Sequence, residues 1–162
     1  KAISSSEEKE DFNARKSAKK KTYSYSFYYS GVELPLKDRY ALRLDKKPNF
    51  ELMKECAKLL EGEHDFKAFC ATKSSVKSTT RTIYSVEIIK NQEGFSINVS
   101  GNGFLYNMVR IIAGTLLKVG GGHILPEEIE KILAGKDRAL AGPTAPAKGL
   151  TLVKIRYPNY EK

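Results

Sequence analysis

Residues 103–119 read Gly-Phe-Leu-Tyr-Asn-Met-Val-Arg-Ile-Ile-Ala-Gly-Thr-Leu-Leu-Lys-Val. Apolar side chains recur in this stretch at spacings of three and four, the period of one face of an α-helix. We therefore predict a helix that opens in the Gly103–Arg110 stretch, runs to about Val119 and has Asn102 as its N-cap. Its buried face is expected to consist of Leu105, Met108, Val109, Ile112, Leu116 and Val119.

The other side of the predicted helix carries a single charge. Arg110 is the only charged residue between Phe104 and Leu117. Leaving a buried charge without its partner costs roughly 3–5 kcal/mol, so a guanidinium in so apolar a helix needs a partner or an exit to solvent. Two interpretations stay open: a surface arginine that extends its head into water, and an arginine directed at a carboxylate or a phosphate.

Composition favours a single folded domain with an anionic partner. The chain has 162 residues, 41% of them hydrophobic, with 28 Lys and Arg against 19 Asp and Glu, a net charge of +9. This excess of cations favours nucleic acid over a membrane surface, although a generically basic protein stays possible. No apolar run approaches the roughly 18 residues of a membrane span. We expect no membrane association.

The cysteines and histidines do not predict a metal site. Cys56 and Cys70 lack paired spacing, which is typical of reduced thiols in the cytoplasm. His64 and His123 lie far apart and no Cys-x-x-Cys is present, so no metal is expected.

A basic run leads into the clearest strand. Residues 15–21 hold five cations and no acid, and a tyrosine-rich alternating segment follows over Thr22–Tyr29. We expect its alternate rings, Tyr25 among them, in the core. Tyr23 stands beside the lysines and either packs in the core or stacks on a base. The cations of this lead-in segment, residues 1–21, are a solvated surface or contact phosphates: Arg15, Lys16, Lys19, Lys20 and Lys21.

The remaining patterns predict an α+β fold, an antiparallel sheet with helices on one face. The expected strands are 1–3, 39–44, 82–90, 95–100 and 150–157, and the expected helices are 50–61 and 126–135, with a helical turn capped by Asp65 in 62–69. Residues 67–81 form either a soluble loop or one that contacts phosphates through Lys73, Lys77 and Arg81.

Four motifs, in this order, resemble the carboxy-terminal domain of the tRNA pseudouridine synthase A family. They span nearly the whole chain, and their combination is far more specific than any one of them. They are Asp11-Phe12-Asn13-Ala14-Arg15-Lys16-Ser17-Ala18, Gly62-Glu63-His64-Asp65-Phe66 with Phe69, Gly103-Phe104-Leu105-Tyr106-Asn107-Met108-Val109-Arg110, and Ala145-Pro146-Ala147-Lys148-Gly149-Leu150.

The resemblance implies half of a pseudouridine synthase fold, ferredoxin-like, in a cytoplasmic homodimer that acts on tRNA without a cofactor. It implies that uridine in the anticodon stem-loop is isomerised after its base is flipped into a cleft. Tyr23 would lie next to the flipped uracil, with Phe104 and Leu105 in the substrate site, and Arg110 would pair with a catalytic Asp.

One departure from the family pattern concerns that Asp. The family places it in an Arg-Thr-Asp-x-Gly-Val-His segment, and this sequence contains none. We therefore interpret the chain as the second half of a two-lobed enzyme, inactive by itself. The alternatives are a stand-alone ferredoxin-like RNA-binding module, although no RNP1 pattern is present, and a purely structural interaction domain.

Overall fold

The computed structural model describes residues 5, 7–71 and 76–158. The expected strand at residues 1–3 and the candidate RNA contact Lys73 lie outside these residues. The elements in chain order are β1 (Lys20–Tyr29), α1 (Pro35–Asp38), β2 (Leu42–Leu44), α2 (Phe50–Leu59), β3 (Gly62–Asp65), a 3-10 turn (Lys67–Phe69), β4 (Thr80–Lys90), β5 (Gly94–Gly101), α3 (Met108–Gly120), α4 (Glu128–Gly135), a 3-10 turn (Ala147–Gly149) and β6 (Leu150–Arg156).

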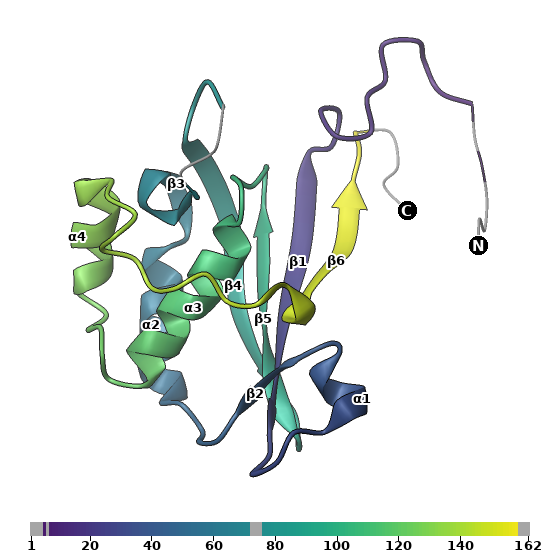
Figure 1. Cartoon of the computed structure of the whole chain (residues 1–162). Coiled ribbons are helices and arrows are strands. Elements are labelled where there is room, and N and C mark those ends of the chain that lie inside the picture. The colour runs from purple at the N-terminus through teal and green to yellow at the C-terminus, as the bar shows by residue number, and fades with distance from the viewer. Residues whose placement is uncertain (1–4, 6, 72–75, 159–162) are drawn as a thin grey trace.

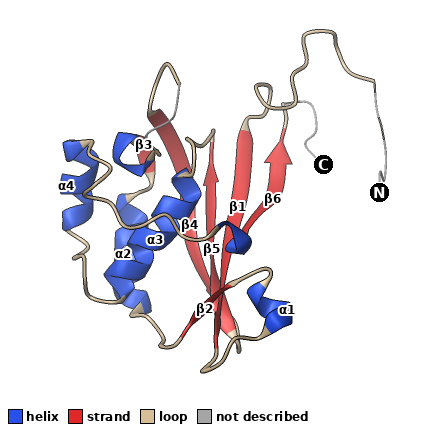
Figure 2. Cartoon of the chain, in the orientation of Figure 1, coloured by secondary structure: helices blue, strands red, loops and turns tan. Residues whose placement is uncertain are grey.

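These elements form one sheet with three helices gathered on one of its faces. The strand order is β2-β1-β5-β4-β3, and β6 pairs with the same edge of β1 as β2, nearer the start of that strand. Figures 1 and 2 show α2, α3 and α4 together on one side of the strands. We call this side the inner face and the opposite side the outer face. The predicted α+β fold is confirmed.

The sheet is mixed rather than wholly antiparallel, because β2 runs parallel to β1. The chain leaves β1, passes through α1 and returns to the same edge in the same direction, and only three residue pairs form there. A parallel neighbour requires such a crossover connection, and the sequence over 30–41 gives little sign of one. All other strand pairs among the described residues are antiparallel.

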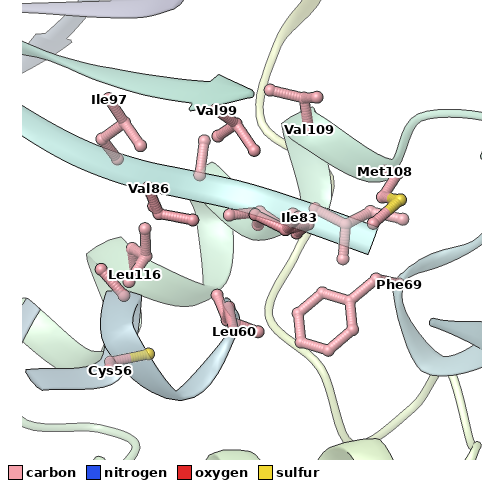
Figure 3. Close-up of a cluster of buried hydrophobic side chains, with 14 of the residues drawn as sticks. Cys56, Leu60, Phe69, Ile83, Val86, Ile97, Val99, Met108, Val109 and Leu116 are labelled. Carbon is pink, nitrogen blue, oxygen red and sulfur yellow. The ribbon is translucent and has the colours of Figure 1, made fainter. Parts of the chain in front are cut away.

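The core lies between the inner face and the helices. Alternate residues of β1 point into it: Tyr25 is fully buried, and the Phe27 ring stacks on Phe95 of β5 with centroids 4.4 Å apart. Figure 3 shows side chains of α2, α3, β4 and β5 converging on one cluster, with Leu116 and Val109 among them. The apolar face predicted for α3 is buried as expected, and all six of its residues are at most 4% exposed.

The N-terminus of α3 differs from the prediction. The helix begins at Met108 because Asn107, its N-cap, has a left-handed backbone with φ 59°. Asparagine tolerates that region better than most residues. Asn102 is not the cap: its Oδ1 accepts a hydrogen bond from the Thr82 backbone N–H at 3.1 Å and so joins the end of β5 to β4.

The 62–69 motif is also extended where a helical turn was expected. Gly62 has φ +104° and turns the chain out of α2, after which residues 62–65 pair with β4 as β3. Only Lys67–Phe69 forms a helical turn. The N-cap of this turn is Phe66 and not Asp65 as expected, although Asp65 Oδ1 accepts the Lys67 backbone N–H at 3.1 Å. His64 Nε2 is hydrogen-bonded to the Glu61 carbonyl at 2.8 Å, consistent with a structural role.

A long segment after α4 crosses α3 before β6 begins, and Figure 1 shows its path. We call residues Pro143–Pro146 the 143–146 segment. A Cβ at Gly114 of α3 would lie 1.9 Å from the Pro143 carbonyl oxygen. Only glycine allows the two main chains to approach this closely.

Gly114→Ala is predicted to lower the free energy of unfolding by about 1–3 kcal/mol, because the methyl group would displace the main chain of the 143–146 segment. The loss should appear although alanine is the better helix former by about 1 kcal/mol. Chemical denaturation measures it, with Gly31→Ala as control, since nothing lies within 4 Å of a Cβ there. Equal stabilities of the two variants would contradict the close contact.

Candidate functional site

Arg110 lies in the first turn of α3 and is held by two hydrogen bonds. Its Nε donates to the Ala145 carbonyl at 2.6 Å, and its Nη1 donates to Asn107 Oδ1 at 3.0 Å. The Ala145 backbone N–H in turn donates to the Arg110 carbonyl at 3.1 Å. Arg110 is therefore half-buried and pinned between α3 and the 143–146 segment, unlike a side chain that extends freely into water.

Part of the Arg110 guanidinium remains available. Nη2 carries two N–H donors, and it has no hydrogen-bond partner among the described residues. No carboxylate of the described residues lies within ion-pair distance of Arg110. The side chain is thus fixed along one edge and offers donors along another, the arrangement that a fork-shaped group needs to bind a carboxylate or phosphate.

Tyr25 fastens the 143–146 segment to the sheet. Its hydroxyl donates to the Pro146 carbonyl at 2.6 Å, and its ring occupies the space that a Cβ on Gly149 would need. Burial raises the pKa of Tyr25 to about 12, and the nearby positive charge of Arg110 opposes this rise. The hydroxyl therefore stays protonated and donates at neutral pH.

Tyr23 and Phe104 form an edge-to-face pair of aromatic rings. Their ring centroids are 5.3 Å apart at 89°. Both rings are half-buried, so Tyr23 is packed against a core neighbour and still partly accessible. Leu105, in contrast, is 4% exposed and belongs to the core. We call Tyr23, Phe104, Asn107, Arg110 and Ala145 together the Arg110 site.

Tyr23 and Arg110 are placed on the same face of the sheet by different elements. Tyr23 and Tyr25 are alternate residues of β1 and both point to the inner face, where Tyr25 lies near Arg110. No hydrogen bond links these two predicted site residues among the described residues; Tyr23 packs against Phe104, and Arg110 bonds Ala145 and Asn107.

The cations of the lead-in segment lie at the same end of the sheet as Tyr23. Asn13 Oδ1 accepts the backbone N–H groups of Arg15 and Lys16, at 3.1 and 3.0 Å, and fixes the turn that exposes their side chains. Lys21 Nζ donates to the Arg15 carbonyl at 2.9 Å. Burial and then the charge of Arg15 lower the pKa of Lys21. The Lys19 backbone N–H bonds to the Arg156 carbonyl, so the run continues directly into the sheet.

The 76–81 part of the predicted RNA-contacting loop reaches this end as well. Arg81 Nη1 donates to the Ser78 and Thr80 carbonyls, at 3.0 and 2.6 Å, and its side chain passes Gly103, next to Phe104. Lys77 is exposed. The structure thus brings Arg81 and the lead-in cations to the end of the sheet where Tyr23 and Phe104 lie.

One hollow lined by described residues borders the Arg110 site at Ala145. It has a volume of about 630 Å³ and lies among β2, the later turns of α3 and the 143–146 segment, with Leu42, Leu117 and Pro143 in its wall. It includes neither Arg110 nor Tyr23. Cavity volume therefore does not identify the Arg110 site.

Sequence reasoning did not assign a site role to Asn107, Tyr25 or Ala145. Asn107 is the left-handed residue that bonds Arg110, and Ala145 supplies the carbonyl that holds it. A signal was present, because the Ala145–Leu150 motif is as distinctive as the Gly103–Arg110 motif. The contact between these two motifs joins residues 35 positions apart and could not be derived from spacing.

Comparison with known proteins decides the family. A family model described as tRNA pseudouridine synthase matches residues 56–158. The chain belongs to this family. That span includes all of α3 and the 143–146 segment, so the family match contains the pinned arginine and its carbonyl partner.

Relatives agree with this assignment and extend further along the chain. The tRNA pseudouridine synthase A of Bacillus subtilis (strain 168) is 46% identical over 148 residues, covering 91% of this chain and 60% of the relative. That of Ruminiclostridium cellulolyticum is 50% identical over 157 residues, covering 96% and 64%. That of Thermoanaerobacter sp. (strain X514) is 47% identical over 148 residues, covering 91% and 61%. The chain spans about three-fifths of the length of these curated relatives.

Two properties of the described ranges concern membranes and metals. None of the helices there has the length and apolar character needed to cross a membrane. In the same ranges, no group of three or more His, Cys, Asp and Glu side chains is arranged to hold a metal ion.

Tyr25→Phe is predicted to lower the free energy of unfolding by about 1–2 kcal/mol at neutral pH, because the Pro146 carbonyl loses its donor. The raised pKa of Tyr25 adds a pH-dependent contribution. That contribution is fully present below the ordinary value near 10 and is lost as pH rises toward 12, because the unfolded state ionises first. The phenylalanine variant should therefore lose less stability than the wild type between pH 10 and 12.

Denaturation at several pH values measures both effects. Tyr40→Phe, at an exposed ring, is the matched control and should behave as the wild type does. A Tyr25→Phe variant with unchanged stability at pH 7 would show that the hydroxyl is not needed to hold the 143–146 segment.

Proposed function

We propose that this chain is part of a tRNA-modifying isomerase that converts uridine to pseudouridine in the anticodon stem-loop. One observation carries the proposal within the family assignment. Arg110 is held by Ala145 and Asn107 while its Nη2 donors stay free, so it is prepared for an acidic partner supplied from outside the described residues. The catalytic Asp of the parent enzyme is that partner. The chain alone is expected to be inactive.

The reaction rearranges one nucleotide without an external reagent. The bond between C1′ and N1 breaks, the base turns, and C1′ joins C5; N1 gains a proton and C5 loses one. No oxidant, reductant or cofactor is needed to balance this change. Arg110 favours the ionised form of the Asp, because an opposite charge within hydrogen-bonding distance lowers the pKa of a carboxyl group.

Tyr23 is assigned to the flipped uracil. A base removed from its stack needs a surface to replace its lost neighbours, and a half-buried ring supplies one. The edge-to-face contact with Phe104 fixes the Tyr23 ring, which supports this role. Phe104 completes the wall of the substrate site, and Leu105 supports it from the core.

The tRNA backbone is assigned to the cations at the same end of the sheet. RNA is recognised largely by its shape and its phosphates, so several spaced cations suffice without base-specific contacts. The proposed contacts are Arg15, Lys16, Lys19, Lys20, Lys21, Lys77 and Arg81, with Lys73 outside the described residues. The parent enzyme is proposed to be a cytoplasmic homodimer.

Arg110→Ala in the full-length enzyme is predicted to reduce single-turnover pseudouridine formation by at least 100-fold, while tRNA affinity changes by less than about 5-fold. A charged group that acts only on the catalytic acid affects the chemical step more than binding. Release of tritium from C5 of the uridine measures the rate.

Arg110→Lys tests the geometry, because lysine keeps the charge but has all its donors on one nitrogen, without the planar fork that bonds the Ala145 carbonyl through Nε and leaves Nη2 for a carboxylate. It should restore only a small part of the rate. Near-normal single-turnover rates of the alanine variant would rule out the role assigned to Arg110.

Lys16→Gln combined with Lys19→Gln is predicted to weaken tRNA binding and to reduce the slope of log affinity against log salt by roughly 1.5, because each phosphate contact contributes about 0.7–0.9 to that slope. Both side chains are exposed. Lys58→Gln with Lys131→Gln removes the same charge from α2 and α4 and should leave the slope nearly unchanged. If the two pairs behave alike, the lead-in cations act only through net charge.

A further inference from the structure

Two β-bulges lie at the same level of the sheet, on either side of β1 and β5. Thr22 of β1 faces Ser100 of β5 and Lys154 of β6. The register of β6 shifts at this point, with Val153 as its extra residue. The register of β4 shifts opposite the same Ser100, and there the extra residue is Tyr84. A bulge changes the face to which the following side chains point. In both β6 and β4, the side chains therefore change face at this level.

The β6 bulge places two cations on the outer face. Before it, Leu152 pairs with Tyr23, an inner-face residue; beyond it, Lys154 pairs with Thr22 and Arg156 with Lys20. Without the extra residue, Lys154 and Arg156 would share the inner face with Tyr23, because side chains alternate along a strand. With it, both join Lys20 on the outer face.

The β4 bulge places an aromatic ring beside these cations. Tyr84 is 47% exposed, while its neighbour Ile83 is buried in the core. Lys20 Nζ lies 5.5 Å from the centroid of the Tyr84 ring, within the range of a cation–π contact. A tyrosine this exposed gains little from the core, so hydrophobic burial does not explain its position.

The cations are not neutralised within the described residues. Lys20, Lys154 and Arg156 form none of the ion pairs found there. Glu87 is the acid on the outer face of β4, and it faces Asn98, two register positions further along the sheet than Ser100. At the level of the two bulges, the facing side chains of Thr22 and Ser100 are hydroxyls bonded to each other at 2.8 Å.

We propose that Lys20, Lys154, Arg156 and Tyr84, here called the basic corner, bind RNA on the outer face. The inference rests on the proposed function and extends it from the inner face, where the Arg110 site lies, to the outer face, where Lys20 is already one of the proposed contacts. Lys20 and Lys21 point to opposite faces at the start of β1, so an RNA backbone at the Arg110 site can continue around this end of the sheet.

The chemistry of the basic corner favours RNA over an acidic protein. Lys154 and Arg156 project from one strand about 7 Å apart, a separation similar to that of successive phosphates along a nucleic acid strand. An exposed ring next to such cations provides a stacking surface for a base.

The first test removes the two bulge-directed charges from the full-length enzyme. Lys154→Gln with Arg156→Gln should reduce the slope of log affinity against log salt by roughly 1.5 for an unmodified tRNA transcript. Lys58→Gln with Lys131→Gln is the charge-matched control. If both pairs lower the slope equally or not at all, the basic corner is not an RNA contact.

The second test examines the ring. Tyr84→Ala should weaken tRNA binding by about 5- to 100-fold and Tyr84→Phe by less than 2-fold, because stacking needs the ring and not the hydroxyl. Tyr40→Ala, at another exposed ring, should have no effect. Equal affinities of the Tyr84→Ala enzyme and the wild type would overturn the stacking role.

Measurements of tRNA binding and modification by the wild-type enzyme distinguish a failure of this inference from a failure of the proposed function. A wild type that neither binds nor modifies the transcript defeats the proposed function itself. A wild type that does both, with basic-corner variants indistinguishable from their controls, overturns only the inference. If polyglutamate of equal charge displaces the transcript and the basic-corner variants lose affinity for both polymers equally, the surface is a general anion site suited to an acidic protein, which also overturns it.

Discussion

Glycine at position 114 lets the main chain of residues 143–146 lie directly against α3, and the Arg110 site depends on this approach. One turn before Gly114, the main chains of Arg110 and Ala145 meet, and the guanidinium bonds the same residue. A side chain of any size at position 114 would separate the two segments. The position of the site's only strongly charged group is thus set by the absence of a Cβ one turn away.

Local patterns in the sequence were enough to predict most elements. The apolar period of α3 and the alternation of β1 reflect burial on one face, and burial is what these patterns record. The errors occurred where a single backbone conformation decides the outcome. The left-handed Asn107 delays the start of α3, and Gly62 turns the following residues into β3 instead of a helical turn. Helix and strand propensities averaged over several residues do not reveal the backbone conformation of one residue.

The candidate site was predicted as residue types but not as an arrangement. Arg110 was conspicuous because it is a lone charge in an apolar helix, and Tyr23 because it follows a basic run. The Ala145 carbonyl that bonds Arg110 and the Pro146 carbonyl that bonds Tyr25 are main-chain atoms. Every residue has such a carbonyl, so the residue types at these positions do not reveal the contacts. The bulges at Val153 and Tyr84 were equally invisible, because an inserted residue changes the facing of a strand without changing its composition.

The hydrogen bonds of Ala145 and Pro146 also bear on how the protein is made. Arg110 and Tyr25 are translated well before the carbonyls that hold them. A nascent chain that has reached the end of α3 already contains β1 and β5, yet its guanidinium and its tyrosine hydroxyl still lack the two carbonyls that hold them. The Arg110 site is therefore complete only after the 143–146 segment has been synthesised, and a chain cut short before Ala145 would lack both hydrogen bonds.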